Sequence, residues 1–113
     1  MDQVVELDDG NFDNEVIQSD QPVLVEFWDE SCLPCKTLTK ALDELAEKYE
    51  GRAKIAHMDV HVNAQTICSL NVEQLPAVLV FQNGNVVDRF VGEEPRDVYC
   101  NAIDGTLVLN WVI

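Results

Sequence analysis

The sequence predicts an α/β fold in which a mixed β-sheet of four to five strands is flanked by four helices. Short apolar runs alternate with segments whose apolar residues recur at helical spacing, an alternation typical of β-α-β units with parallel strands. Near the end of the chain, Asn83-Gly84 joins two apolar runs and is a strong β-hairpin signal, which requires an antiparallel pair. With 113 residues, we expect a single domain over residues 1–113 with one core.

Each expected element has a local signal. Residues 23–28 form an apolar run bounded by charges, which predicts a strand buried on both faces. Pro22 ends the helix before this strand, because the residue preceding a proline disfavours helical backbone. In chain order we expect a strand at 4–7, a helix at 12–17, a strand at 23–28, a helix from Pro34 to about residue 48 closed by Gly51, a strand at 53–60, a helix at 63–70, strands at 77–81 and 86–91, and a last helix from about residue 93 to 104. Gly105 is a candidate interruption before an apolar tail, which is compatible with a longer helix, packing on the sheet or a partner surface.

Cys32 and Cys35 lie where the central strand is expected to run into the following helix. At a helix N-terminus the unpaired N–H groups and the macrodipole favour negative charge, and therefore favour a thiolate over a thiol. The second cysteine lies one helical turn away and can close a disulfide with the first. A Cys-x-x-Cys pair beside a β-α-β pattern therefore indicates redox chemistry rather than a structural pair or metal ligands.

The charge balance excludes some classes of partner. Twenty-one acidic residues against seven basic ones give a formal net charge of −14, which argues against nucleic acid and against an anionic membrane surface as partners. The first residues show neither a basic nor an apolar stretch, so we expect no secretory signal, and no segment has the apolar length of a bilayer span. Its four cysteines do not resemble a secreted disulfide scaffold, so we expect a reducing, cytoplasmic location.

Several ordered motifs resemble those of the thioredoxin family, over about residues 4 to 104. The resemblance implies the thioredoxin fold for the α/β arrangement expected above. The usual family segment is V-D-F-W-A-x-W-C-G-P-C-K. The matching stretches here are Val25-Glu26-Phe27-Trp28, Cys32-Leu33-Pro34-Cys35-Lys36, Leu75-Pro76-Ala77, Val78-Leu79-Val80-Phe81-Gln82-Asn83-Gly84 and Val91-Gly92.

The resemblance implies that Cys32 is the nucleophile and Cys35 the resolving thiol. Glu26 is a carboxylate inside an apolar strand, where burial raises the pKa of an acid. It stands at the position of the buried family aspartate, which implies a role as general base or proton relay for Cys35. The alternative is an outward-facing acid. Pro34 suits the first turn of the helix, because it has a fixed φ and no N–H to satisfy.

Two departures concern charge near the cysteines. His57 stands where the family commonly has a lysine, and a histidine titrates near neutrality. We therefore hypothesise that Glu26 and His57 form a coupled pair that makes activation of Cys35 more dependent on pH. The alternative is a histidine that is merely packed on its strand. Lys36, directly after the motif, partly offsets the acidic Asp29 and Glu30.

The expected docking rim is apolar. Leu75-Pro76 resembles the cis-proline loop of the family, whose backbone would pair with an extended substrate segment. Leu33 replaces the usual glycine, which makes the rim more apolar, although this position also tolerates many residues. Ser31 stands where the family has a second tryptophan. Around Cys32, the residues expected to bind substrate are Trp28, Leu33, Pro34, Leu75, Val91 and Gly92.

On the fold that the resemblance implies, the helices of Cys68 and Cys100 lie on opposite faces of the sheet, so a disulfide between them is not expected. Each is predicted to be a small buried hydrophobe. The spacing of cysteines and histidines matches no common zinc site, so no metal is expected.

The resemblance implies a protein-disulfide reductase that needs no bound organic cofactor. Its partners would be disulfide-containing proteins and a thioredoxin reductase, either NADPH- or ferredoxin-linked. Two alternatives stay open at this point: a subunit that holds one partner with little turnover, and a thiol sensor whose Cys32 and Cys35 are oxidised by peroxide.

Overall fold

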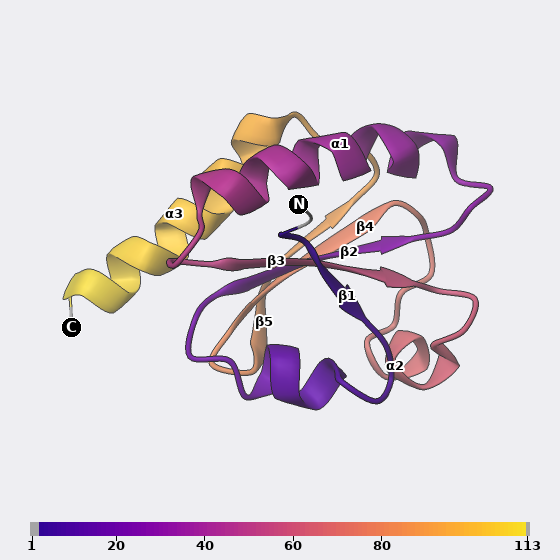
Figure 1. Ribbon diagram of the computed structural model, residues 1–113, viewed down its shortest axis with the longest axis horizontal. Coiled ribbons are helices and arrows are strands. Elements are labelled where there is room, and N and C mark those ends of the chain that lie inside the picture. Colours follow the sequence, from indigo (N-terminus) through magenta and orange to yellow (C-terminus); the bar gives the residue numbers. More distant parts are fainter. Residues whose placement is uncertain (1–2, 113) are drawn as a thin grey trace.

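The computed structural model describes residues 3–112, with side chains described for residues 3–108. Within this part, a five-stranded sheet is covered by four helices (Figure 1). The elements are β1 (Val5–Leu7), η1 (Asp13–Ile17), β2 (Val23–Trp28), α1 (Leu33–Lys48), β3 (Lys54–Asp59), α2 (Ala64–Ser69), β4 (Ala77–Gln82), β5 (Asn85–Val91) and α3 (Arg96–Val112). Their order and type agree with the pattern of the sequence, so the predicted fold class is confirmed.

The sheet has the strand order β1-β3-β2-β4-β5. β3 pairs in parallel with both β1 and β2, whereas β4 is antiparallel to β2 and β5 is antiparallel to β4. Opposite Phe27 near the end of β2 lies Ala77 at the start of β4, and Ala77 in turn lies opposite Val91 at the end of β5. The junction from β2 to α1 and the Leu75-Pro76 loop therefore lie at the same end of the strands.

Two helical layers cover the sheet. Figure 1 shows α1 and α3 on one face, and η1 and α2 on the other. Side chains of β2 alternate between these layers. Leu24 belongs to the buried cluster that includes Leu42 of α1, and Val25 belongs to the cluster that includes Val16 of η1. Glu26, two residues after Leu24, therefore faces α1.

The last helix is longer than the sequence predicted. α3 continues through Gly105 to Val112, so the expected interruption at Gly105 is wrong. A glycine inside a helix costs about 1 kcal/mol relative to alanine. Buried contacts on both sides of Gly105 outweigh this cost: Ile103 and Thr106 are 1% and 5% exposed. Tertiary packing thus extends a helix that local propensity would end. The end of the apolar tail, Ile113, lies outside the described residues.

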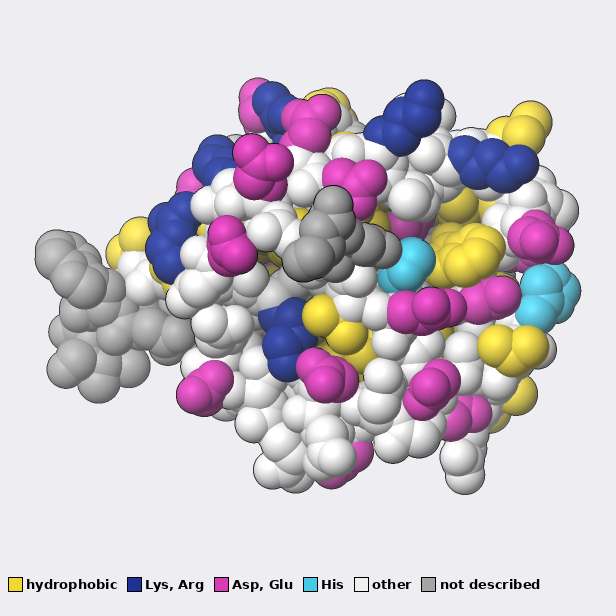
Figure 2. Space-filling model, in the orientation of Figure 1, with side chains coloured by type: hydrophobic (Ala, Val, Ile, Leu, Met, Phe, Trp, Pro, Cys, Tyr) yellow, Lys and Arg dark blue, Asp and Glu magenta, His cyan; other side chains and the backbone are white. Residues whose placement is uncertain are grey.

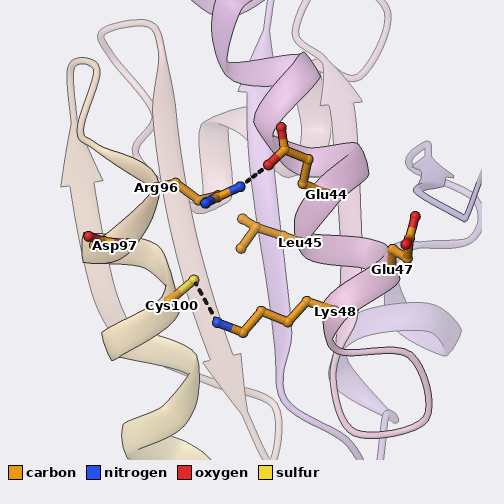
Figure 3. Close-up of a pocket in the computed structure, with 7 residues that line it drawn as sticks. All are labelled: Glu44, Leu45, Glu47, Lys48, Arg96, Asp97 and Cys100. Carbon is orange, nitrogen blue, oxygen red and sulfur yellow. Dashed lines mark hydrogen bonds and ion pairs between the residues drawn. The ribbon is translucent and has the colours of Figure 1, made fainter.

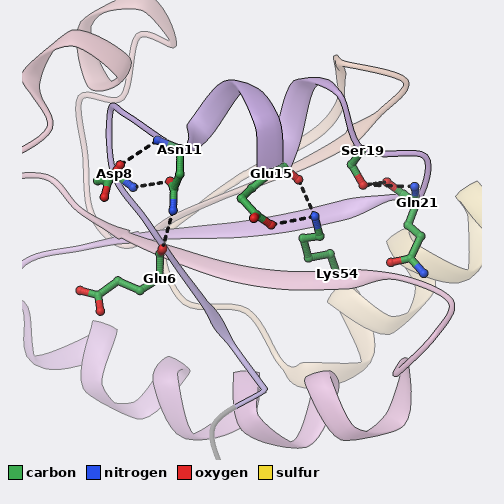
Figure 4. A network of polar contacts seen from close by, with 7 residues as sticks. All are labelled: Glu6, Asp8, Asn11, Glu15, Ser19, Gln21 and Lys54. Carbon is green, nitrogen blue, oxygen red and sulfur yellow. Dashed lines mark hydrogen bonds and ion pairs between the residues drawn. The ribbon is translucent and has the colours of Figure 1, made fainter.

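Polar contacts hold η1 against the sheet (Figure 4). Asp8 and Asn11 each accept the backbone N–H of the other at 2.8 Å. Lys54 at the start of β3 donates to the main-chain oxygen of Glu15 at 2.8 Å and to its carboxylate at 3.0 Å. The bonds between Asp8 and Asn11 close the turn that follows β1. The bonds of Lys54 tie η1 to the start of β3, at the end of the sheet distant from the cysteines.

None of the described helices is long and apolar enough to cross a bilayer. In Figure 2, acidic side chains are spread over the visible face and basic ones lie mainly along its upper edge, over α1. Histidine and hydrophobic side chains are exposed at the right-hand end, where β2 runs into α1 in Figure 1.

Candidate active site

The junction between β2 and α1 is a tight turn that presents Cys32. Asp29 accepts the backbone N–H of Ser31 at 3.0 Å through its side chain and that of Cys32 at 3.0 Å through its carbonyl. Cys32 is the N-cap of α1, and its sulfur accepts the backbone N–H of Cys35 at 3.2 Å. Pro34 lies in the first turn of the helix, where it leaves no N–H unsatisfied. The local sequence thus sets the sulfur of Cys32 at the positive end of α1.

Cys32 and Cys35 form a disulfide, with their Cα atoms 5.3 Å apart. The two cysteines differ in accessibility: Cys32 is partly exposed, whereas Cys35 is only 1% exposed. An outside molecule can therefore approach Cys32 but not Cys35. The pair can store and release two electrons, as the motif predicted.

Glu26 is completely buried, as the sequence predicted. Its Oε1 accepts a hydrogen bond from the hydroxyl of Thr39 at 3.2 Å, and its Oε2 has no hydrogen-bond partner among the residues that the structure describes. Burial raises the pKa of Glu26 to about 7, and the bond from Thr39 partly opposes this rise. The carboxyl can consequently gain and lose a proton near neutral pH, beside the helix that carries Cys35.

His57 lies directly opposite Glu26 in the parallel pairing of β2 and β3. The two side chains share the α1 face of the sheet, because residues at paired positions point the same way. The imidazole stacks on the indole of Trp28, with ring centroids 5.9 Å apart. Within the described part of the chain, no hydrogen bond or ion pair joins His57 to Glu26. The structure thus brings them together without a direct bond.

A second loop completes this end of the sheet. The Leu75–Pro76 peptide bond is cis, and the carbonyl of Pro76 accepts the backbone N–H of Gly92 at 2.8 Å. Gly92 has φ +90°, and a Cβ built there meets nothing within 4 Å. The loop between β5 and α3 is therefore held beside the cis-proline loop, with open space over Gly92.

The predicted rim residues are at the surface. Leu33 is 72% exposed and Val91 is 50% exposed, while Trp28, Leu75 and Gly92 are partly exposed and Pro34 is exposed. A hollow of about 480 Å³ beside the rim is bordered by Trp28, Cys35, Lys36, Thr39 and His57, among others. Apolar side chains that are exposed together are typical of a contact surface for another protein.

Sequence reasoning missed two side chains of this region. Thr39 bonds Glu26, and its position four residues after Cys35 was the available signal, since residues four apart share a helix face. His61 is exposed, and its Nε2 lies 3.1 Å from a carboxylate oxygen of Asp29. No pattern in the sequence indicates that contact, which joins two loops.

The two remaining cysteines differ from each other. Cys100 is 6% exposed, as predicted, and faces a groove between α1 and α3, where Lys48 lies 3.7 Å from its sulfur and Arg96 pairs with Glu44 (Figure 3). Cys68 is exposed, so its prediction as a buried hydrophobe is wrong. α2 is only six residues long. Its buried Thr66 hydrogen-bonds Asp9 and its Ile67 packs against the core, which leaves Cys68 on the outward side.

Among the described residues, no group of three or more histidine, cysteine or acidic side chains is arranged to hold a metal ion.

Comparison with known proteins agrees with this geometry. The family model described as Thioredoxin matches residues 3–105. Thioredoxin C-2 of Corynebacterium nephridii is 39% identical over 101 residues, covering 89% of this chain and 94% of the relative. Thioredoxin of Haemophilus influenzae is 38% identical over 104 residues, covering 92% and 97% of the two chains. Thioredoxin 1 of Nostoc sp. is 32% identical over 104 residues, covering 92% and 97%. The chain therefore belongs to the thioredoxin family and is a protein-disulfide oxidoreductase with Cys32–Cys35 as its redox pair.

Proposed function

We propose that Cys32 is the attacking sulfur and Cys35 the resolving sulfur in the reduction of protein disulfides. The observation that carries this assignment is the difference in exposure: Cys32 is partly exposed at the start of α1 and Cys35 is 1% exposed. Exchange requires an accessible attacking thiolate, and the resolving thiol needs to reach only its neighbour.

The reaction has two exchange steps. The Cys32 thiolate attacks one sulfur of the client disulfide, the client S–S bond breaks, and its second sulfur leaves as a thiolate that takes up a proton. Cys35 then loses its proton and attacks the sulfur of Cys32. The Cys32–Cys35 bond forms, the bond to the client breaks, and the client leaves fully reduced with two electrons from the cysteine pair.

Glu26 is proposed to accept the proton that Cys35 loses. Its complete burial on the α1 face and its pKa of about 7 support this role, since a general base works best when its pKa lies near the working pH. His57, on the same face, is proposed to couple to Glu26 and to steepen the pH dependence. Superimposable pH profiles of disulfide reduction for the wild type and His57→Lys would contradict that coupling.

The rim is proposed to bind the client. Trp28, Leu33 and Val91 offer apolar contacts around Cys32, and the open space over Gly92 admits a client backbone. The backbone of Leu75, before the cis-proline, would pair with an extended client segment. Leu33 is proposed to narrow the client range, because it adds an exposed apolar side chain between the cysteines. Lys36, exposed after the motif, is proposed to favour the Cys32 thiolate.

Three further proposals concern the setting of this reaction. An NADPH- or ferredoxin-linked thioredoxin reductase is proposed to return two electrons to the Cys32–Cys35 disulfide. Residues 1–113 are proposed to act as one domain, which the continuous sheet from β1 to β5 and the packing of α3 on it support. A cytoplasmic location is proposed from the cysteine pattern.

Reduction of insulin by dithiothreitol tests the assignment of the two sulfurs. Cys32→Ser should abolish catalysis. When reduced Cys35→Ser is mixed with insulin after dithiothreitol has been removed, a mixed disulfide between Cys32 and the client should accumulate. Cys68→Ser is the matched control, because it removes an exposed cysteine outside the pair and should leave the rate unchanged. Full turnover by Cys32→Ser, or a client trapped on Cys35, would overturn the assignment. No acceleration by the wild type would instead favour the partner-binding alternative, which the exposed Leu33 also suits.

A further inference from the structure

We propose that Thr39 is a positioning residue for the resolving step: its hydroxyl holds the buried carboxyl of Glu26 and controls how readily that group gives up and takes back a proton. This inference rests on the proposed role of Glu26 as the proton acceptor for Cys35. Thr39 takes no part in the two exchange steps proposed above, so it acts through Glu26.

The proposal is based on the two contacts of the Thr39 hydroxyl. Thr39 Oγ1 lies 3.2 Å from Oε1 of Glu26 and 2.9 Å from the main-chain oxygen of Cys35. A single side chain of α1 therefore connects the buried acid on β2 to the backbone of the resolving cysteine. Thr39 is partly exposed and borders the hollow beside the rim, whereas Glu26 is completely buried and lies behind it.

A hydroxyl suits both protonation states of the acid. It has one proton to donate and lone pairs to accept with. When Glu26 is ionised, the hydroxyl can donate to the carboxylate. When Glu26 is protonated, its own O–H can donate to Thr39 Oγ1, and the hydroxyl can then donate to the carbonyl of Cys35. Neither state leaves the hydroxyl unsatisfied, so the proton can leave and return with little rearrangement.

The balance at Glu26 makes this contact important. Its Oε2 is buried with no hydrogen-bond partner in the described part of the chain, which penalises the carboxylate. Thr39 supplies the hydrogen bond that opposes the penalty. Other titratable or charged groups lie around Glu26 and the hollow beside it. They are His57 on β3, Tyr99 on α3, Cys35, Lys36 and Lys40 on α1, and Asp29 and Glu30 after β2. Within the described residues, only Thr39 hydrogen-bonds the carboxyl.

The test compares four variants of the whole chain. Thr39→Val removes the hydroxyl and keeps a similar shape, Thr39→Ser keeps the hydroxyl, and Thr39→Ala is a second deletion with less steric demand. Thr37→Val is the matched control, because Thr37 is exposed on the same helix. Nuclear magnetic resonance of the Glu26 side-chain carbonyl across pH measures its titration. Single-turnover release of client from the mixed disulfide measures the resolving step.

We expect the titration midpoint of Glu26 to rise by about one pH unit in Thr39→Val and Thr39→Ala, the size of a lost hydrogen bond to a charged group. Below the midpoint, client release should slow about tenfold, because a tenfold smaller fraction of Glu26 is ionised. Above about pH 9 the rates should converge. Thr39→Ser should restore both readouts, and Thr37→Val should change neither.

An unchanged Glu26 midpoint in folded Thr39→Val and Thr39→Ala would overturn the inference. The same holds if Thr39→Ser fails to restore what the deletions remove. Glu26→Gln separates this failure from failure of the proposed function. If Glu26→Gln abolishes the pH dependence of client release while the Thr39 variants leave it intact, Glu26 keeps its role and only Thr39 loses its own. If Glu26→Gln keeps the wild-type profile, the role of Glu26 fails and the inference falls with it.

Discussion

Glu26 should make the protein less stable as pH rises, and Glu26→Gln should remove this effect. The pKa of the buried carboxyl is about 7 in the folded state against an ordinary value of 4.5, because burial penalises its charge. Below pH 4.5 the group is protonated in both the folded and the unfolded chain, so it adds no penalty. Between these values the unfolded chain ionises first, and the folded state loses stability relative to it.

The magnitude follows from the two values. Each pKa unit corresponds to about 1.4 kcal/mol, so a rise from 4.5 to about 7 gives a penalty of about 3 kcal/mol once both states are ionised. Glutamine has nearly the same shape and cannot ionise. Glu26→Gln should therefore match the wild type near pH 4 and exceed it by about 3 kcal/mol near pH 8 in free energy of unfolding.

Urea denaturation of the disulfide form, at several values of pH, measures this difference. Glu47→Gln, at an exposed position of α1, corrects for the general loss of one negative charge. A gap between Glu26→Gln and the wild type that stays constant from pH 4 to pH 8, or that has the opposite sign, would contradict a charge penalty at Glu26.

Three other predictions concern packing, backbone and docking. Leu42→Ala should lower the free energy of unfolding by about 2–5 kcal/mol in urea, because Leu42 is 0% exposed between α1 and the sheet, and a loss below 1 kcal/mol would contradict this packing. Gly92→Ala should destabilise the fold by about 1–2 kcal/mol, because the φ of Gly92 is +90°. Gly105→Ala should stabilise it by about 1 kcal/mol, because Gly105 is inside α3. Thermal unfolding measures both changes, and stability changes of the same sign would contradict this prediction. Leu33→Ser should change stability by less than about 0.5 kcal/mol, since the side chain is 72% exposed, while kcat/KM for insulin falls a few-fold, about 1 kcal/mol. Unchanged kcat/KM would remove Leu33 from the docking rim.

Patterns along the chain were sufficient for the architecture. Periodicity distinguishes strands from helices locally, and the signals at Pro22 and Asn83-Gly84 act within a few residues, so element order and the hairpin followed directly. The two motif cysteines and the buried Glu26 were also found this way. A strand-to-helix junction and a lone acid in an apolar run are themselves local patterns.

What depends on contacts between distant segments came only from the tertiary structure. The bond from Thr39 to Glu26 depends on how α1 is rotated about its axis above β2. The 3.6-residue period predicts which face of α1 is buried, but it does not predict which side chain of the sheet Thr39 meets. Continuation of α3 through Gly105 and the exposure of Cys68 depend on how each helix packs, and the pairing of His61 with Asp29 depends on two loops meeting. The sequence by itself determined which elements form and which thiols react, because those are short-range properties. Only the tertiary structure decided which side chains surround Glu26 and influence its pKa, because these groups come together from separate elements of the fold.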